Sequence, residues 1–281
     1  MRGLRRRAVI SEEHTMQILH WVRAAVVGLC VGGCAGMQGG VSQETRAAVA
    51  PTGTLRVAFL LGPIYATKDS ATGEFTGVAV DLGKELARRV GVPFQAVVYA
   101  NPPALIGGAK SGEWDVAMAG INAERAAAMD FTAPYMEVEQ GYLVRAGVPV
   151  ATAADVDRAG IRIGVLEKSG AELQLSKTLK HAELVRVNSP AENFALMDTG
   201  KVDLIAATKT ALFAGATSRP GSRVLDGRIV VEPIGMGVPK GRNAAAAMYI
   251  AKYVEEAKSA KLVATAIKGA GLRGVAVAPP R

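Results

Sequence analysis

The chain has 281 residues, of which 49% are hydrophobic, 21% charged and 5% aromatic, and its formal net charge is +8. This length and composition allow one large or two modest domains with apolar cores, and they exclude a disordered body. Lysines and arginines are scattered after residue 33 with no dense run, which argues against nucleic-acid binding and fits a mild attraction for anions.

The first 33 residues have the pattern of a signal peptide. Residues 21–33, "WVRAAVVGLCVGG", are apolar and small, and arginines precede them. This run is too short to cross a bilayer as a helix, but it suits the apolar region of a signal peptide. Met16 is an alternative start, because a leader from there has a more ordinary length. Removing residues 1–33 takes away five arginines and two glutamates, so the net charge falls from +8 to +5.

Both cysteines of the chain lie in or directly after this region, at positions 30 and 34. Cys34 follows "VGG", and this ending resembles the lipoprotein box, in which the cysteine is lipidated and becomes the first residue. The alternative is an ordinary signal peptide cleaved slightly later, after "CAG". Since Cys30 is the other cysteine, the mature chain has no disulfide and depends on core burial. Residues 34–52 are rich in Gly, Ala, Gln, Ser and Thr and predict a flexible tether.

The first part of the body alternates strands and helices. In the first expected helix Leu82, Leu86 and Val90 recur four apart, and Gly91 ends it. The order strand, helix, strand, helix, strand predicts a parallel sheet covered by helices. We expect strands at 54–61, 93–99 and 114–120, and helices at 78–90 and 103–110.

The same rhythm begins again after an outgoing strand at 140–146. Ser169 with Glu172, and Ser189 with Glu192, have the spacing of capping boxes at two helix starts. Strands are expected at 161–166, 183–187 and 202–208, and helices from 169, at 189–199, 209–216, 243–258 and 260–269. The segment 229–241, "IVVEPIGMGVPKG", runs back to the first unit.

Two such units, one inserted in the other, predict two lobes. We assign 53–143 plus 233–281 to lobe 1 and 144–232 to lobe 2. The chain then crosses twice between the lobes, near 141–147 and 231–239, and two crossings make a natural hinge. A ligand would bind in the cleft that faces the carboxyl ends of the strands.

Four blocks of the body resemble family 3 of the bacterial extracellular solute-binding proteins, the periplasmic receptors of amino-acid-type ABC importers. They are "GEFTGVAVDLGKELARRVGV", "ALIGGAKSGEWDVAMAGINAERAAAMDFTAPYM", "IGVLEKSGAE" and "SPAENFALMDTGKVDLIAATKT", in order between residues 53 and 270. The resemblance implies a two-lobed α/β fold of the type II periplasmic-binding-protein kind. It also implies a small-molecule ligand, a membrane permease as partner, a periplasmic or extracytoplasmic location, a monomer, and no metal or cofactor.

Within the second block, the family's Thr-x-x-Arg turn places its arginine on the ligand carboxylate. Carried over, this makes Arg125 a carboxylate clamp, because its planar fork matches a carboxylate and stays charged. The alternatives are a solvated arginine at a helix start and an arginine paired with Glu124 or Asp130. Gly120 and Asn122 flank the clamp, and the family usually has Ser or Thr at the position of Gly120.

Other ligand contacts follow from the remaining blocks. Ser169 and Gly170 match a Gly-Thr-Thr turn whose helix N-terminus offers N–H groups to the same carboxylate. Tyr65 matches an aromatic wall of the ligand site, with core packing as the alternative.

The chain departs from the family where the amine of an amino acid is bound. Thr208 stands where the amino-acid receptors carry an aspartate, and Lys209 follows it, either as a second anion contact or as a solvated lysine. We therefore expect a small carboxylate or similar anion without a free amine. Acidic side chains arriving from elsewhere would reverse this expectation, with Glu74, Glu137 and Glu167 as the candidates.

Two further functions remain open from the sequence. A cyclohexadienyl dehydratase-like enzyme shares the fold and uses a glutamate near the second-lobe turn, where this chain has Glu172; ordinary receptors carry a capping glutamate there as well. A sensor domain would need a signalling segment after residue 270, where the chain has only a short ending, "GVAVAPPR". His181 is the one histidine after the leader, and no catalytic constellation is apparent.

Overall fold

The computed structural model describes residues 41–281. The predicted signal peptide and Cys34 therefore lie outside the described residues, as does the first part of the predicted tether. Its later part is not a free tether: α1 (Gln43–Val49) begins at Ser42, whose side chain caps it, and ends at buried Val49 and Ala50. Arg46 also donates from Nε to the carbonyl of Val90 at 3.0 Å, so this segment is tied to the body.

Three parallel strands form the first half of the sheet, as the alternation predicted. β1 (Leu55–Leu60) lies between β4 (Phe94–Tyr99) and β5 (Val116–Gly120). Their connecting helices are α2 (Val78–Val90) and α3 (Pro102–Ser111). α2 ends at Gly91, whose positive φ of 76° is the left-handed conformation that glycine adopts without strain.

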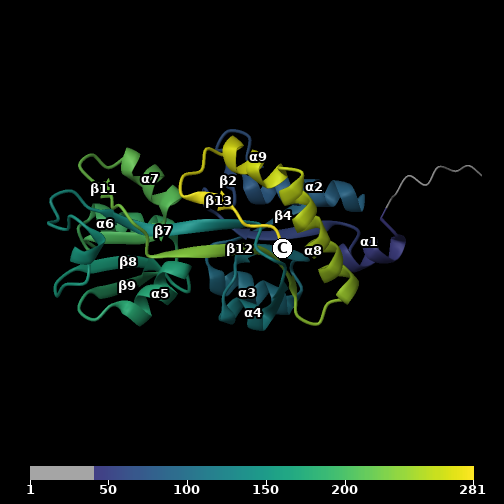
Figure 1. The fold of residues 1–281 in the computed structure, drawn as a ribbon, viewed down its shortest axis with the longest axis horizontal. Helices are drawn as coiled ribbons and strands as arrows, with labels where there is room; N and C mark the ends of the chain where they lie inside the picture. Colours follow the sequence, from purple (N-terminus) through teal and green to yellow (C-terminus); the bar gives the residue numbers. More distant parts are fainter. Residues whose placement is uncertain (1–40) are drawn as a thin grey trace, which may run out of the picture. The chain divides into compact units, whose positions relative to one another are not determined.

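Two long antiparallel strands carry the sheet onward (Figure 1). β12 (Val230–Pro239) pairs with β5 through its second half and with β7 (Met136–Val144) through its first half. β7 then pairs over residues 140–144 with β10 (Leu204–Thr208). Within residues 41–281 the sheet has the order β4-β1-β5-β12-β7-β10-β8-β9, where β8 (Arg162–Leu166) and β9 (Glu183–Val187) continue the second parallel set.

The remaining elements are shorter or flank the sheet. They are β2 (Thr67–Lys68), β3 (Phe75–Thr76), α4 (Ala123–Ala128), β6 (Met129–Phe131), a 3-10 turn (Ala153–Asp155), α5 (Gly170–Thr178), α6 (Pro190–Asp198), α7 (Lys209–Thr217), β11 (Arg223–Val224), α8 (Ala244–Ser259), α9 (Leu262–Gly269) and β13 (Val275–Val277). No helix in the described part of the chain combines the length and hydropathy needed to cross a membrane.

The hydrophobic cores fall into two sets, as expected of two lobes. One set is built from residues 49–138 and 234–266 and contains the large buried side chains of Trp114, Tyr135 and Tyr253. The other set is built from residues 142–225. In the part of the chain that the structure describes, the long strands β7 and β12 join the two regions of the sheet and form the structural link between the lobes.

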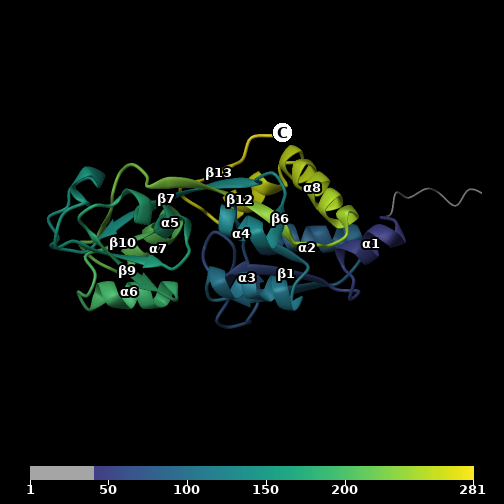
Figure 2. The ribbon, with the colours of Figure 1, turned by 90° about the horizontal axis from the view of Figure 1, so that it is seen from below.

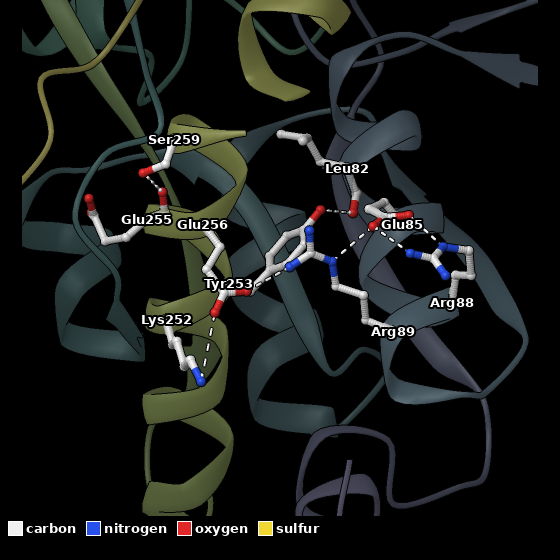
Figure 3. A network of polar contacts seen from close by, with 9 residues as sticks. All are labelled: Leu82, Glu85, Arg88, Arg89, Lys252, Tyr253, Glu255, Glu256 and Ser259. Carbon is white, nitrogen blue, oxygen red and sulfur yellow. Dashed lines mark hydrogen bonds and ion pairs between the residues drawn. The ribbon is translucent and has the colours of Figure 1, made fainter. Parts of the chain in front are cut away.

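Helices α2 and α8 belong to the first lobe (Figure 2), and polar contacts join them (Figure 3). The hydroxyl of Tyr253 donates to the carbonyl of Leu82 at 2.8 Å, and the guanidinium of Arg89 lies 5.0 Å from the centre of the Tyr253 ring. Arg89 pairs with Glu85 on its own helix at 2.8 Å and with Glu256 on α8 at 2.7 Å. The residues of this network lie on α2 and α8 and not on the central strands β5, β12 and β7, which contribute to the site described below.

Candidate functional site

A cavity of about 130 Å³ lies where segments of both lobes approach the long strands. Most of its wall is apolar, formed by Leu60, Leu61, Pro63, Ile64, Pro102, Leu166, Phe194, Ile205, Ala206, Ala207 and Ala211. The polar side chains of the wall are those of Tyr65, Arg125, Gln140, Ser169, Asn193, Thr208 and Glu232. Among the described residues, the wall therefore contains one basic and one acidic side chain.

Arg125 is buried, with 4% of its surface exposed, and its guanidinium bonds to three different segments. Nη1 donates to the carbonyl of Gly120 on β5 at 2.8 Å and to Oε1 of Glu232 on β12 at 3.0 Å. Nη2 donates to the carbonyl of Lys168, in the turn before α5, at 3.1 Å. The arginine thus lies in the wall where the sequence predicted it, but its partner is neither Glu124 nor Asp130.

Glu232 is the residue that the sequence reasoning missed. Glu232 is buried, with 8% of its surface exposed, and the second oxygen of its carboxylate accepts a hydrogen bond of 2.6 Å from Nε2 of Gln140 on β7. Both residues come from the crossing segments, which were predicted as a hinge and not as a site. A glutamate in the otherwise apolar run "IVVEPIGMGVP" was the available signal, because a buried carboxylate needs a cation or several donors.

Two glycines make room for this carboxylate. A Cβ at Gly120 would lie 1.9 Å from Oε1 of Glu232 and 2.6 Å from Nη1 of Arg125. A Cβ at Gly170 would lie 2.8 Å from Cδ and Oε2 of Glu232. Glycine at position 120, where the resemblance led us to expect Ser or Thr, is therefore explained by the glutamate opposite it.

The other predicted site residues lie at several places. Ser169 lines the cavity and its Oγ caps α5 by accepting from the N–H of Glu172 at 3.2 Å. Thr208 lines the cavity and caps α7. Asn122 is not part of the wall, because its side chain caps α4 by accepting from the N–H of Arg125 at 2.9 Å. Lys209 is also outside the wall, since its ammonium pairs with Glu139 at 2.7 Å.

Tyr65 is 7% exposed and lies beside the charged pair. Burial raises the pKa of its phenol well above the ordinary value, and the carboxylate of Glu232 raises this pKa further. The phenol is therefore neutral at physiological pH. Tyr65 lines the cavity and also packs in the hydrophobic core of the first lobe, so its surroundings combine the two predicted alternatives.

Asn193 on α6 is a polar wall residue that the sequence did not single out. It is 3% exposed, and its Oδ1 is buried with no hydrogen-bond partner among the described residues. This oxygen points toward Gly164 on β8, where an added Cβ would lie 1.9 Å away. A buried unpaired amide oxygen is costly, so this position is unusual.

Glu172, which carried the enzyme alternative, faces away from the cavity. Its Oε1 accepts from Nε of Arg186 at 2.9 Å and from the hydroxyl of Ser176 at 2.8 Å, and it is not part of the wall. Glu74, Glu137 and Glu167 are also outside the wall. Among the described residues, no group of His, Cys, Asp and Glu has the arrangement of a metal site.

Comparison with known proteins supports the reading of the sequence blocks. Residues 55–179 match the bacterial extracellular solute-binding proteins of family 3. The ABC transporter glutamine-binding protein of Bacillus subtilis (strain 168) is similar to this chain, with 22% identity over 190 residues that cover 65% of this chain and 68% of that protein.

Two solved structures show the same fold. An ancestral arginine-binding protein bound to glutamine has a TM-score of 0.68 and 27% identity, covering 77% of this chain and 97% of that one. A mutant of ArgBP from T. maritima has a TM-score of 0.69 and 23% identity, covering 80% of this chain and 98% of that one. The predicted resemblance and the two-lobed fold class are thereby confirmed.

Proposed function

We propose that this chain, which resembles the family 3 extracellular solute-binding proteins in sequence and in fold, captures a carboxylate-bearing amino-acid-type solute for an ABC importer. The observation that carries the proposal is Arg125, buried in the wall of an apolar cavity between the two lobes. Its planar fork suits a carboxylate, and the N-terminus of α5 at Ser169 and Gly170 adjoins it. The similar proteins named for glutamine and arginine favour the amino-acid class.

The expectation of a solute without an amine rested on a cleft without an acidic side chain. Glu232 lines the cavity, so that premise is wrong, and the amine is no longer excluded. The binding experiment below tests whether the solute is instead an anion without an amine.

Binding, and not catalysis, is the activity that the relatives share. The similar proteins are binding proteins for glutamine and arginine. The glutamate proposed as a general acid pairs with Arg186 outside the cavity, which leaves it without access to a bound solute.

Calorimetric titration of the purified chain with the twenty standard amino acids and a panel of organic acids tests this function. We expect micromolar binding of at least one amino acid and a loss of at least a hundredfold in Arg125→Ala. Arg125→Lys should restore little, because an ammonium lacks the planar fork. Binding of organic acids alone would replace the amino-acid class, and no binding of either set would refute the function.

Export and attachment through Cys34 remain part of the proposal. The chain would act outside the cytoplasm as a monomer beside its permease, held by a lipid on this cysteine. A Cys34→Ala variant should lose a radiolabelled lipid and either accumulate as precursor or be released. Unchanged processing and membrane retention in that variant would rule the lipid anchor out.

A further inference from the structure

We infer that Glu232 is a specificity-determining residue. Its carboxylate pairs with Arg125 before the solute binds, is displaced from Arg125 by the carboxylate of the solute, and then binds the solute's amine. This inference rests on the proposed function and assigns the part of the site that recognises the amine. In the structure, the carboxylate of Glu232 lies on the arginine fork itself, at 3.0 Å from Nη1. A solute carboxylate that binds the same fork must therefore replace it.

The position of this carboxylate is built into both lobes. Gly120 belongs to β5 of the first lobe, and Gly170 begins α5 of the second. Any side chain at either position would meet the carboxylate of Glu232 at 2.8 Å or less. Gln140 adds a donor to the second oxygen at 2.6 Å. The surrounding residues thus leave space for the carboxylate of Glu232 and hold it in the cavity wall by hydrogen bonds.

Charge balance then selects the class of solute. An anion without an amine would take Arg125 and leave the carboxylate of Glu232 buried without a cation, which is strongly destabilising. A simple cation would compete for Glu232 and leave Arg125 unpaired. A zwitterion inserted between the two gives each of them an opposite charge.

An α-amino acid fits this requirement in its geometry as well. Its carboxylate and ammonium leave the same carbon, so they reach partners that are neighbours, as Arg125 and Glu232 are. Lys168 and Lys209 adjoin wall residues in the sequence but pair with other carboxylates, Lys209 with Glu139 at 2.7 Å and Lys168 with Glu124 at 3.6 Å. With Thr208 at the position of the family's aspartate, Glu232 is the acidic side chain of the described wall.

Matched pairs of compounds test this assignment. The probes are L-glutamine with glutaramic acid and L-arginine with 5-guanidinovaleric acid, which differ only in the α-amine. We expect the wild-type chain to prefer the amino acid of a pair by at least a hundredfold. In Glu232→Gln, which keeps the shape and removes the charge, this preference should fall at least tenfold, mainly because the amine-free acid binds better.

Two further variants separate charge from folding. Gly170→Ala should push the carboxylate of Glu232 out of its position and reduce the preference in the same direction. Glu256→Gln, on α8 and outside the cavity wall, is the control and should leave the preference unchanged. Circular dichroism before titration shows which variants are folded. If Glu232→Gln is not folded, the preference measured for Gly170→Ala tests the role of Glu232.

The outcomes distinguish this inference from the function on which it rests. An unchanged preference in Glu232→Gln and in Gly170→Ala, with amino-acid binding still abolished in Arg125→Ala, would overturn the role of Glu232 alone. Wild-type preference for the amine-free acids would also overturn it while keeping the binding function. Wild-type failure to bind either member of both pairs, with none of the twenty amino acids bound, would overturn both.

Discussion

Arg125 has two tasks, because its guanidinium both faces the cavity and neutralises a buried carboxylate. If Arg125 only held the solute, Arg125→Ala would lose binding and keep its fold. The structure predicts a different result, since the substitution leaves Glu232 buried without its cation. We expect Arg125→Ala to lose roughly 3–5 kcal/mol of unfolding free energy, the usual cost of breaking a buried ion pair from one side.

Urea denaturation of the purified variants measures this effect. The double variant Arg125→Met with Glu232→Leu should recover most of the lost stability, because it replaces the pair by apolar side chains of similar volume. Binding should not recover in the double variant. A single Arg125→Ala variant as stable as the wild type would show that Glu232 finds another partner.

Asn193 and Gln140 offer a matched pair of buried amides in the same wall. Gln140 donates to Glu232, whereas Oδ1 of Asn193 has no partner among the described residues. Asn193→Leu should therefore leave the unfolding free energy unchanged or raise it by about 1 kcal/mol, and Gln140→Leu should lower it by about 1–3 kcal/mol. Thermal and urea denaturation check both signs, and a loss of stability in Asn193→Leu would show that its amide is satisfied in solution.

The sequence predicted Arg125 but not Glu232, and the difference has a physical reason. Arg125 was found because it sits in a block with a recognisable local pattern. Glu232 was missed because nothing near it in the sequence indicates its partner, which lies 107 positions away. A long-range ion pair becomes visible only when β12 and α4 are placed side by side.

At the level of the elements, one anchoring arrangement occurs in both lobes. Asp115 follows a Gly-x-x-Asp pattern and accepts from the N–H, Nε and Nη2 of Arg56 at the start of β1. Asp203 follows the same pattern and accepts from the same three groups of Arg162 at the start of β8. Each aspartate thereby fixes the register between two parallel strands.

This arrangement predicts a pH dependence of stability. Burial alone would raise the pKa of Asp203, but hydrogen bonds from Arg162 outweigh it and hold this pKa below its ordinary value. A lowered pKa in the folded state stabilises the fold above the unfolded pKa of about 3.9, and this contribution is lost as the pH falls through the folded pKa.

The variant Asp203→Asn should therefore be less stable than the wild type at pH 7, by about 1–3 kcal/mol. The difference should begin to shrink below about pH 4, where the carboxyl is protonated in the unfolded chain, and should largely disappear once the pH falls below the lowered pKa of the folded chain. Urea titrations at pH 7, 5, 4 and 3 follow it. A difference that stays constant over this range would show that the charge of Asp203 is not what stabilises the strands.

The main helices and parallel strands could be predicted from local patterns, because each has its own periodicity and caps. Helix 243–258 was expected, and α8 occupies Ala244–Ser259. The short strands β6, β11 and β13 were not expected, since each is only two or three residues long and pairs with a distant strand. Their pairing depends on tertiary placement, which no local pattern reveals.

Across the whole described body, several contacts join the two walls of the cleft. Nη2 of Arg125 donates to the carbonyl of Lys168, and the ammonium of Lys168 lies 3.6 Å from Glu124. Nδ2 of Asn101 donates to the carbonyl of Asn188 at 3.4 Å. Because β7 and β12 link the two lobes within residues 41–281, we expect such contacts to influence the balance between an open and a closed arrangement.

Solute binding should shift this balance toward the closed arrangement. Small-angle scattering should give a smaller radius of gyration at saturation with a bound amino acid than before its addition. Asn101→Ala, which removes a contact outside the cavity wall, should weaken binding less than tenfold and leave the preference within each compound pair unchanged. An unchanged radius at saturation would argue against hinge closure.

The close approach of Gly120 to Glu232 also constrains which amino-acid substitutions this pocket can accept during evolution. A hydroxyl-bearing side chain at position 120 would require the carboxylate of Glu232 to leave its present position, because the added Cβ alone would lie 1.9 Å from a carboxylate oxygen. Shortening Glu232 first would leave Arg125 without its anion. Either single step is therefore harmful by itself, whereas the two together restore a side chain and its space. The two positions are epistatic, and a lineage that exchanges one of them must pass through a damaged intermediate or change both.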